Sequence, residues 1–439
     1  MGATVRTEAV QRALSASERW FWLVDQLSPA NCVVRIRVRG PIGAYRLEFA
    51  AEALVAEFPL LRSVVGQGPC FVASADPHLP VLHRIVVGLD DWRTVFDTQL
   101  ATPVDLATAP GRIVDLAFRP GTDDEQHDLI VVFSHVYLDG RSMVALVWRL
   151  LAYAFGAQPV VTARPAIPAP DDLIPPAQTR MWRCLWTNVS AQLTAFARRA
   201  VSLPGCPPPL PIRRTRTVVR TITGEKLIAL RARCQRESVT VNALLAAALA
   251  EAIGGHAPKA TGTVGIGIPV DIRTRLYPPP AEDEPGMFTA VVPTFVPFGT
   301  DLPDAARSAK AQLDRGIARH ADLRSLAAIR YGCPRTLESG RRTIELIDRR
   351  APWNVTLSNL GLVTPPKTPE PLHITDVTVA GTNSCASALT VGVATFDNTM
   401  SITFCYVDTM LPRATIEALA DTMIAIAGCS DRNNVEQRT

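Results

Sequence analysis

The stretch Ser134-His135-Val136-Tyr137-Leu138-Asp139-Gly140 carries more information about this chain than any other. It comes directly after the apolar run 129–133, which has the composition of a buried strand, and before residues 142–155, whose apolar side chains have helical spacing. A histidine between a strand and a helix is expected on an exposed loop, and such loops often carry catalytic residues. The sequence therefore predicts a catalytic role for His135.

The chemistry expected of this motif follows from its side chains. An imidazole has a pKa near 6.5, so His135 can remove a proton from a hydroxyl or an amine near neutral pH. We expect Asp139 to fold back against the backbone or to reach an arginine, which would fix the loop, and Gly140 to allow a tight turn. The alternative is a chance match, in which the Asp-Gly pair forms an ordinary turn.

The motif resembles the active-site motif of the superfamily of condensation domains and coenzyme A-dependent acyltransferases. This superfamily includes chloramphenicol acetyltransferase and the polyketide-associated acyltransferases of mycobacteria. Five further stretches resemble its other motifs and follow in the same order, at 14–19, 53–63, 103–106 with 109–112, 239–247 with 269–273, and 358–361. The resemblance implies an α/β fold with two chloramphenicol acetyltransferase-like lobes, each a mixed sheet with flanking helices, and an active-site tunnel between them.

The resemblance also implies roles for single residues. His135 corresponds to the histidine that acts in the family, and Asp139 would pair with Arg273, which follows a strand of the second lobe. Ser134 stands where many members have a first histidine, and we treat it as a candidate substrate-binding residue. The Gly140 backbone N–H is a candidate for binding an oxyanion, and the Asn359 side chain is a weaker one.

The predicted function is acyl transfer from a thioester to a hydroxyl or amine acceptor, with ester formation favoured over amide formation, in secondary or lipid metabolism. The acyl donor would be acyl-coenzyme A or a phosphopantetheine-linked thioester, used as a co-substrate, and no permanently bound cofactor is expected. An acyl carrier protein or a polyketide or peptide synthetase is an expected partner, beside a small-molecule acceptor. The alternative is a condensation-like module that binds a carrier protein without catalysis.

Composition narrows the class of protein. The chain has 439 residues, of which 47% are hydrophobic, so it can form two lobes with ample apolar cores. Its 45 basic residues are spread along the chain and the net charge is only +4, which argues against a nucleic-acid partner. The nine cysteines and the other six histidines show no metal-ligand spacing, so no metal site is expected.

Targeting signals are not evident in the sequence. The first thirty residues contain several charged side chains and no apolar core of sufficient length for a secretory signal. The longest apolar segments are interrupted by charge, so no transmembrane segment is expected. We therefore expect a cytoplasmic protein, and a monomer.

Proline-rich segments indicate the domain boundaries. Residues 1–160 are expected to form the first lobe with the histidine motif, 161–217 a proline-rich crossover, and 218–439 the second lobe. Residues 389–406 read as a hairpin around Asp397-Asn398. The resemblance implies that this hairpin crosses from the second lobe to the first. Six large apolar residues of the crossover have helical spacing, namely Trp182, Leu185, Trp186, Val189, Leu193 and Phe196. They predict an amphipathic helix, which either packs on the lobes or forms a lid over an acyl chain or a carrier-docking surface.

Overall fold

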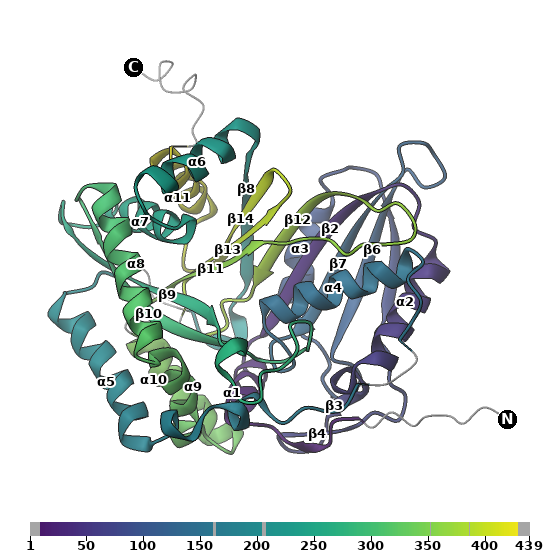
Figure 1. Ribbon diagram of the computed structural model, residues 1–439, viewed down its shortest axis with the longest axis horizontal. Coiled ribbons are helices and arrows are strands. Elements are labelled where there is room, and N and C mark those ends of the chain that lie inside the picture. Colours follow the sequence, from purple (N-terminus) through teal and green to yellow (C-terminus); the bar gives the residue numbers. More distant parts are fainter. Residues whose placement is uncertain (1–8, 161–163, 204–207, 352, 386, 429–439) are drawn as a thin grey trace.

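The chain folds into two α/β lobes that lie side by side, each built around its own sheet (Figure 1). The computed structural model describes residues 9–160, 164–203, 208–351, 353–385 and 387–428. Each lobe has a separate large hydrophobic core. The predicted fold class of two lobes with mixed sheets and flanking helices is therefore confirmed.

The first lobe is a five-stranded sheet covered by helices on both faces. Its strand order is β12 (His373–Gly381), β2 (Asn31–Arg39), β7 (Gln126–Ser134), β6 (Gly111–Phe118) and β5 (Val81–Val86). Helices α2 (Ala44–Glu57) and α4 (Gly140–Ala154) pack together on the sheet, and α3 (Trp92–Ala101) lies between it and the second lobe. Beside them lie α1 (Ala16–Asp25) and a small sheet of β1 (Arg12–Ala13), β4 (Cys70–Ala73) and β3 (Ser63–Val65).

The histidine motif lies after the central strand of this sheet. Residues 129–133 are fully buried in β7, between β2 and β6, which explains their uninterrupted apolar composition. Its neighbour β2 contains the alternating apolar and arginine residues 33–38.

The second lobe is a six-stranded sheet. Its strand order is β10 (Thr289–Phe298), β9 (Gly262–Asp271), β11 (Val355–Leu362), β13 (Leu389–Phe396), β14 (Thr399–Val407) and β8 (Thr215–Thr223). Its helices are α6 (Gly224–Arg236), α7 (Val241–Gly254), α8 (Leu302–Ala318), α9 (Ala321–Gly332), α10 (Leu337–Arg350) and α11 (Arg413–Ile426). The Ala- and Leu-rich α7 is buried on nearly all sides, because it packs against α8, α11 and the β9–β10 pair.

The prediction of a hairpin that crosses between the lobes is wrong in one respect. Strands β13 and β14 do form the predicted hairpin, but both are hydrogen-bonded inside the second sheet. The crossing strand is β12, which pairs antiparallel with β2 of the first lobe. The hairpin still touches the first lobe, because Ala394 and Cys405 belong to the first core.

The crossover helix α5 (Met181–Ala197) packs against α9, on the outer side of the second lobe (Figure 1). Helix α9 also contacts α1, so it lies between α5 and the first lobe. This position does not support a lid over the active site.

Cys184, on α5, is buried. Cys206 and Cys429 lie outside the described residues.

No single helix in the described part of the chain is long and apolar enough to cross a membrane. Helices α6 and α7 pass that test as a pair on length and composition only, with a bend of 99° between them.

Candidate active site

The loop that carries His135 joins β7 to α4 and is buried in the seam between the lobes. Val136, Tyr137 and Leu138 have almost no exposed surface, and only His135 keeps a partly accessible side chain. The expectation of an exposed loop is therefore wrong, because the second lobe covers this end of the first sheet. The loop is anchored at its start, where the His135 N–H donates to the Ala30 carbonyl at 2.7 Å.

The imidazole of His135 is fixed by two neighbours. The Phe21 ring of α1 stacks on it with centroids 4.4 Å apart and an angle of 19° between the ring planes. Its Nδ1 lies 3.3 Å from Sδ of Met287, which belongs to the second lobe. If the proton of the neutral ring is on Nδ1, that N–H points at the sulfur and Nε2 is the basic nitrogen.

The pKa of His135 is lowered from its usual value by burial, although the negative charge of Asp139 acts in the opposite direction. The imidazole is therefore neutral near neutral pH and ready to accept a proton.

Asp139 binds groups of both lobes. It is 1% exposed and caps α4, where its Oδ1 accepts from the Ser142 N–H at 2.8 Å. Its Oδ2 accepts from the Phe288 N–H at 2.8 Å and from Thr289 Oγ1 at 3.1 Å, both in the second lobe. Its own N–H donates to the Gly286 carbonyl at 3.0 Å. This geometry gives Asp139 a structural position that joins the lobes.

Arg273 reaches the same junction from the second lobe. Its Nη2 lies 3.5 Å from Asp139 Oδ1 and donates to Ser142 Oγ at 2.6 Å. Its guanidinium also lies over the Phe288 ring and within 3.1 Å of Asp271. Arg273 therefore lies beside Asp139, as the resemblance implied, but its shortest contact across the seam is with Ser142.

Gly140 is the first residue of α4, so its N–H is among those that no intrahelical bond uses. It does not have the positive φ that a tight glycine turn would require. A Cβ at this position would lie 3.2 Å from Cδ2 of Leu360, at the bulge in β11. The close approach of the β11 bulge thus explains a residue without a side chain here.

The other two candidates are held by local contacts. Ser134 is fully buried at the end of β7, and its Oγ accepts from the Val136 N–H at 3.3 Å. This burial argues against Ser134 as a substrate-binding residue. Asn359 is partly exposed, and its Oδ1 accepts from the Gly361 N–H at 2.9 Å, so its acceptor oxygen stabilises the β11 bulge.

Sequence reasoning missed the segment 286–289, which supplies the second lobe's contacts to the motif. Gly286 exchanges hydrogen bonds with Ser142, and Met287 contacts His135. A Pro-Gly pair that ends a proline-rich, acidic stretch just before a strand is a turn signal that could have drawn attention to it. The contact with α4 itself has no local signal, because the two segments are far apart in sequence.

A second anchor fixes the loop that precedes this segment. Arg164 pairs with Asp283 at 2.6 Å and with the fully buried Glu57 carboxylate at 2.8 Å. Burial alone would raise the pKa of Glu57, but hydrogen bonds from Arg149, Tyr153 and Arg164 outweigh it and lower that pKa. Because Glu57 belongs to α2 and Asp283 to the second lobe, this network also ties the lobes together.

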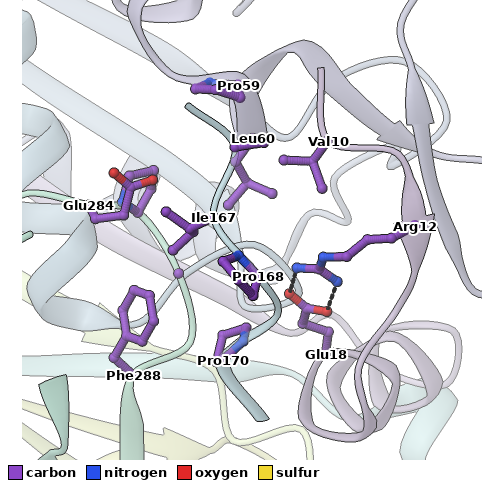
Figure 2. Close-up of a pocket in the computed structure, with 13 residues that line it drawn as sticks. Val10, Arg12, Glu18, Pro59, Leu60, Ile167, Pro168, Pro170, Glu284 and Phe288 are labelled. Atoms are coloured by element: carbon purple, nitrogen blue, oxygen red, sulfur yellow. Dashed lines mark hydrogen bonds and ion pairs between the residues drawn. The ribbon is translucent and has the colours of Figure 1, made fainter. Parts of the chain in front are cut away.

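A small cavity of about 10 Å³ lies beside this loop, with room for roughly one water. Figure 2 shows Glu284 and Phe288 on one side of it, Leu60 and Val10 on another, and the paired Arg12 and Glu18 at its edge. Glu284 is buried there, and burial raises its pKa to about 7 even though Arg164 acts in the opposite direction.

A larger groove of about 550 Å³ opens between the lobes. Residues 25–29, after α1, and the end of α3 line one side, and Arg214 and Arg216 line the other. The wall formed by residues 25–29 leads directly to Ala30, whose carbonyl binds the His135 backbone. The groove therefore lies one residue along the chain from the backbone contact that holds the His135 loop, and His135 itself is not among the residues that line it. A group of three or more His, Cys, Asp or Glu side chains suited to a metal ion does not occur among the described residues.

The sequence of the second lobe matches a known family. Residues 214–418 match the family model described as phthiocerol/phthiodiolone dimycocerosyl transferase C-terminus. No curated protein matches the chain at a significant level.

The whole chain is similar in fold to several solved structures. It is 17% identical to polyketide synthase associated protein 5 from Mycobacterium tuberculosis, with a TM-score of 0.70 over 95% of this chain and 98% of that one. It is 14% identical to the trichothecene 15-O-acetyltransferase of Fusarium sporotrichioides, with a TM-score of 0.71 over 95% and 94%.

A third similar structure is the first condensation domain of the calcium-dependent antibiotic synthetase in complex with a substrate analogue. It is 16% identical, with a TM-score of 0.69 over 96% of each chain. These similarities confirm the predicted resemblance and the predicted fold.

Proposed function

We propose that this chain, which has the two-lobed fold of the condensation-domain acyltransferases, transfers an acyl group from a thioester to a hydroxyl or amine, with His135 as the general base. The donor is acyl-coenzyme A or a phosphopantetheine-linked thioester on a carrier protein. The acceptor is a small molecule of natural product or lipid biosynthesis, and the expected product is an ester. Cytoplasmic location and a monomeric state remain predictions.

The observation that carries this proposal is the setting of His135. Its side chain is held between Phe21 and Met287 in the seam between the lobes, and burial keeps it neutral by lowering its pKa. A fixed, neutral imidazole in the seam between two lobes suits proton removal from an acceptor bound between them. A module that only binds a carrier protein has no need of such a base.

The proposed reaction has two steps. In the first, His135 takes the proton of the acceptor hydroxyl as its oxygen forms a bond to the thioester carbonyl carbon, which gives a tetrahedral oxyanion. In the second, the carbon–sulfur bond breaks and the departing thiolate takes this proton from the imidazolium. The Gly140 N–H is the candidate donor to the oxyanion. A base of this kind contributes about 10² to 10⁴-fold, and positioning of the two substrates supplies the rest.

The groove between the lobes suits the phosphate-bearing part of the donor. Arg214 and Arg216 are exposed along one wall, and Arg93 and Arg413 line an adjoining pocket of about 290 Å³. Guanidinium groups bind phosphate oxygens well, and both proposed donors carry phosphates.

The test is thiol release on mixing the protein with acyl-coenzyme A thioesters and alcohol acceptors. His135→Ala should lower turnover at least about a hundredfold, because the base is lost. His78→Ala, at an exposed histidine outside the site, is the matched control and should leave turnover unchanged. Turnover of His135→Ala within a few-fold of the wild type would contradict the role of His135 as the base, whereas no thiol release from the wild type would favour the non-catalytic module.

The same preparation distinguishes direct transfer from a covalent route. The buried thiols of Cys32, Cys385 and Cys405 have raised pKa values because burial disfavours the thiolate, so they are poor nucleophiles. Incubation with an acyl thioester and no acceptor should therefore leave the intact mass unchanged. A stable adduct of one acyl group would contradict the two-step reaction above.

A further inference from the structure

Helix α5 has its apolar side turned away from the protein. Its large apolar side chains are 45–85% exposed, namely Trp182, Leu185, Trp186, Val189, Leu193 and Phe196. Their spacing places them on one face of the helix. The residues that face the protein are Cys184, which is buried, and partly buried small or polar residues such as Thr187, Ser190 and Thr194. A helix that packs on a protein normally has the reverse arrangement.

The charge of this segment is equally one-sided. All four charged residues between Asp172 and Arg213 are arginines, at positions 180, 183, 198 and 199. Arg180 and Arg199 stand exposed at the two ends of α5, and the guanidinium of Arg183 lies 5.1 Å from the Trp182 ring centroid. An outward apolar stripe with two tryptophans and a phenylalanine, bracketed by arginines, is the composition of helices that lie in the interface of an anionic membrane.

We propose that α5 docks the protein on the surface of an anionic phospholipid bilayer. The 17-residue helix lies in the plane of the membrane, its apolar side chains enter the boundary between headgroups and acyl chains, and the arginines contact the lipid phosphates. The helix lies at the outer edge of the second lobe, on the far side of α9 from α1, so a flat surface can reach it (Figure 1). The proposal does not depend on the catalytic role of His135.

The first test is co-sedimentation of the full chain with vesicles. Binding to vesicles of equal parts phosphatidylglycerol and phosphatidylcholine should be at least about tenfold tighter than to phosphatidylcholine alone, and should weaken as salt rises. Trp186→Glu with Phe196→Glu should lower the partition coefficient at least about tenfold. The matched control is Ile85→Glu with Val87→Glu, at exposed apolar positions of the first lobe, and should bind as the wild type does.

A second measurement uses the wild-type fold. Brominated lipids in the anionic vesicles should quench part of the tryptophan emission, and Trp182→Phe with Trp186→Phe should remove most of that quenching. Three outcomes would overturn the proposal: no binding to anionic vesicles, unchanged binding of the glutamate variant, or a wild-type dimer that the glutamate variant dissociates. The last outcome would show that a second copy covers the stripe.

Discussion

Asp139 illustrates how much a single side chain contributes at the seam between the lobes. Its carboxylate accepts hydrogen bonds from α4 on one side and from residues 288–289 on the other, and it lies beside the buried guanidinium of Arg273. A neutral side chain of the same shape keeps some of these contacts but removes one of the two carboxylates beside the guanidinium.

We therefore expect Asp139→Asn to destabilise the fold. Loss of one partner of a buried charge pair typically costs about 3–5 kcal/mol, chiefly because the other charge is stranded. Ser142 and Asp271 remain near Arg273, so the lower end of this range is expected. The measurement is unfolding in urea, with Asp271→Asn, at a more exposed partner of Arg273, as the milder control. A variant with wild-type stability and no activity would instead place Asp139 in the chemistry.

The titration of His135 should appear in the pH dependence of the reaction. Burial lowers the pKa of His135, so the base form is already complete near neutral pH and is lost only as the pH falls below the usual 6.5. We expect kcat/KM to be flat above neutral pH and to fall with a midpoint below 6.5. Asp139 raises the pKa of His135, so Asp139→Asn should move the midpoint lower still. A midpoint above 6.5 would contradict the assigned environment.

At this scale, the sequence predicted the residues within one local motif better than their partners. His135, Asp139 and Gly140 are close in sequence, so the motif alone predicted that they lie together between a strand and a helix. Phe21 and Met287 come from distant segments, and no local pattern marks a side chain that stacks on an imidazole. Ser134 was misjudged for a similar reason, because its direction at the strand end depends on packing.

Among the elements, the loop before β10 depends on a buried acid. The pKa of Glu284 is raised from 4.5 to about 7, so the neutral form stabilises the fold. That stabilisation is complete below pH 4.5 and is lost as the pH rises through about 7.

We expect Glu284→Gln to be more stable than the wild type at pH 8, by roughly 2–3 kcal/mol, since a shift of one pKa unit corresponds to about 1.4 kcal/mol. The difference should vanish near pH 4.5. Thermal unfolding at both pH values measures it, and Glu282→Gln, two residues away and exposed, should change little at either. A variant less stable than the wild type at pH 8 would show that the carboxylate is favourable in its cavity.

Elements were predicted well where their periodicity is local, and poorly where their partners matter. The two strand-like runs within residues 389–406 and the turn at Asp397-Asn398 predicted a hairpin, and β13 and β14 form it. Which sheet a strand joins depends on backbone hydrogen bonds that any sequence can make. The hairpin was therefore assigned a crossing that β12 makes instead.

For the whole molecule, β12 is the strand that makes the two lobes inseparable. Arg35 in β2 is fully buried, lies over the Trp92 ring, and pairs with Asp376 of β12 at 2.5 Å and with Asp128 of β7. The first lobe on its own would lack both the edge strand β12 and the Asp376 carboxylate that pairs with Arg35.

We therefore expect residues 1–203, expressed alone, to be insoluble or to self-associate through β2, because an unpaired hydrophobic edge strand invites pairing with other chains. Co-expression with residues 208–439 should restore solubility. The measurement is the soluble yield of each fragment, expressed with and without the other. The soluble yield of residues 1–203 that carry Arg35→Met is measured in the same way. A soluble, monomeric first fragment would show that β12 is dispensable.

Strand β12 also determines when the first sheet can be completed during translation. The nascent chain has made every other strand of the first sheet by Ser134, but the strand that completes it ends only at Gly381. At about 5–20 residues per second, the flank of β2 stays open for roughly 10–50 s of translation. During that interval the incomplete first lobe avoids pairing with other nascent chains on the same messenger RNA only if chaperones bind it or if it collapses slowly. Codon choice between residues 134 and 381 should therefore affect the yield of native protein.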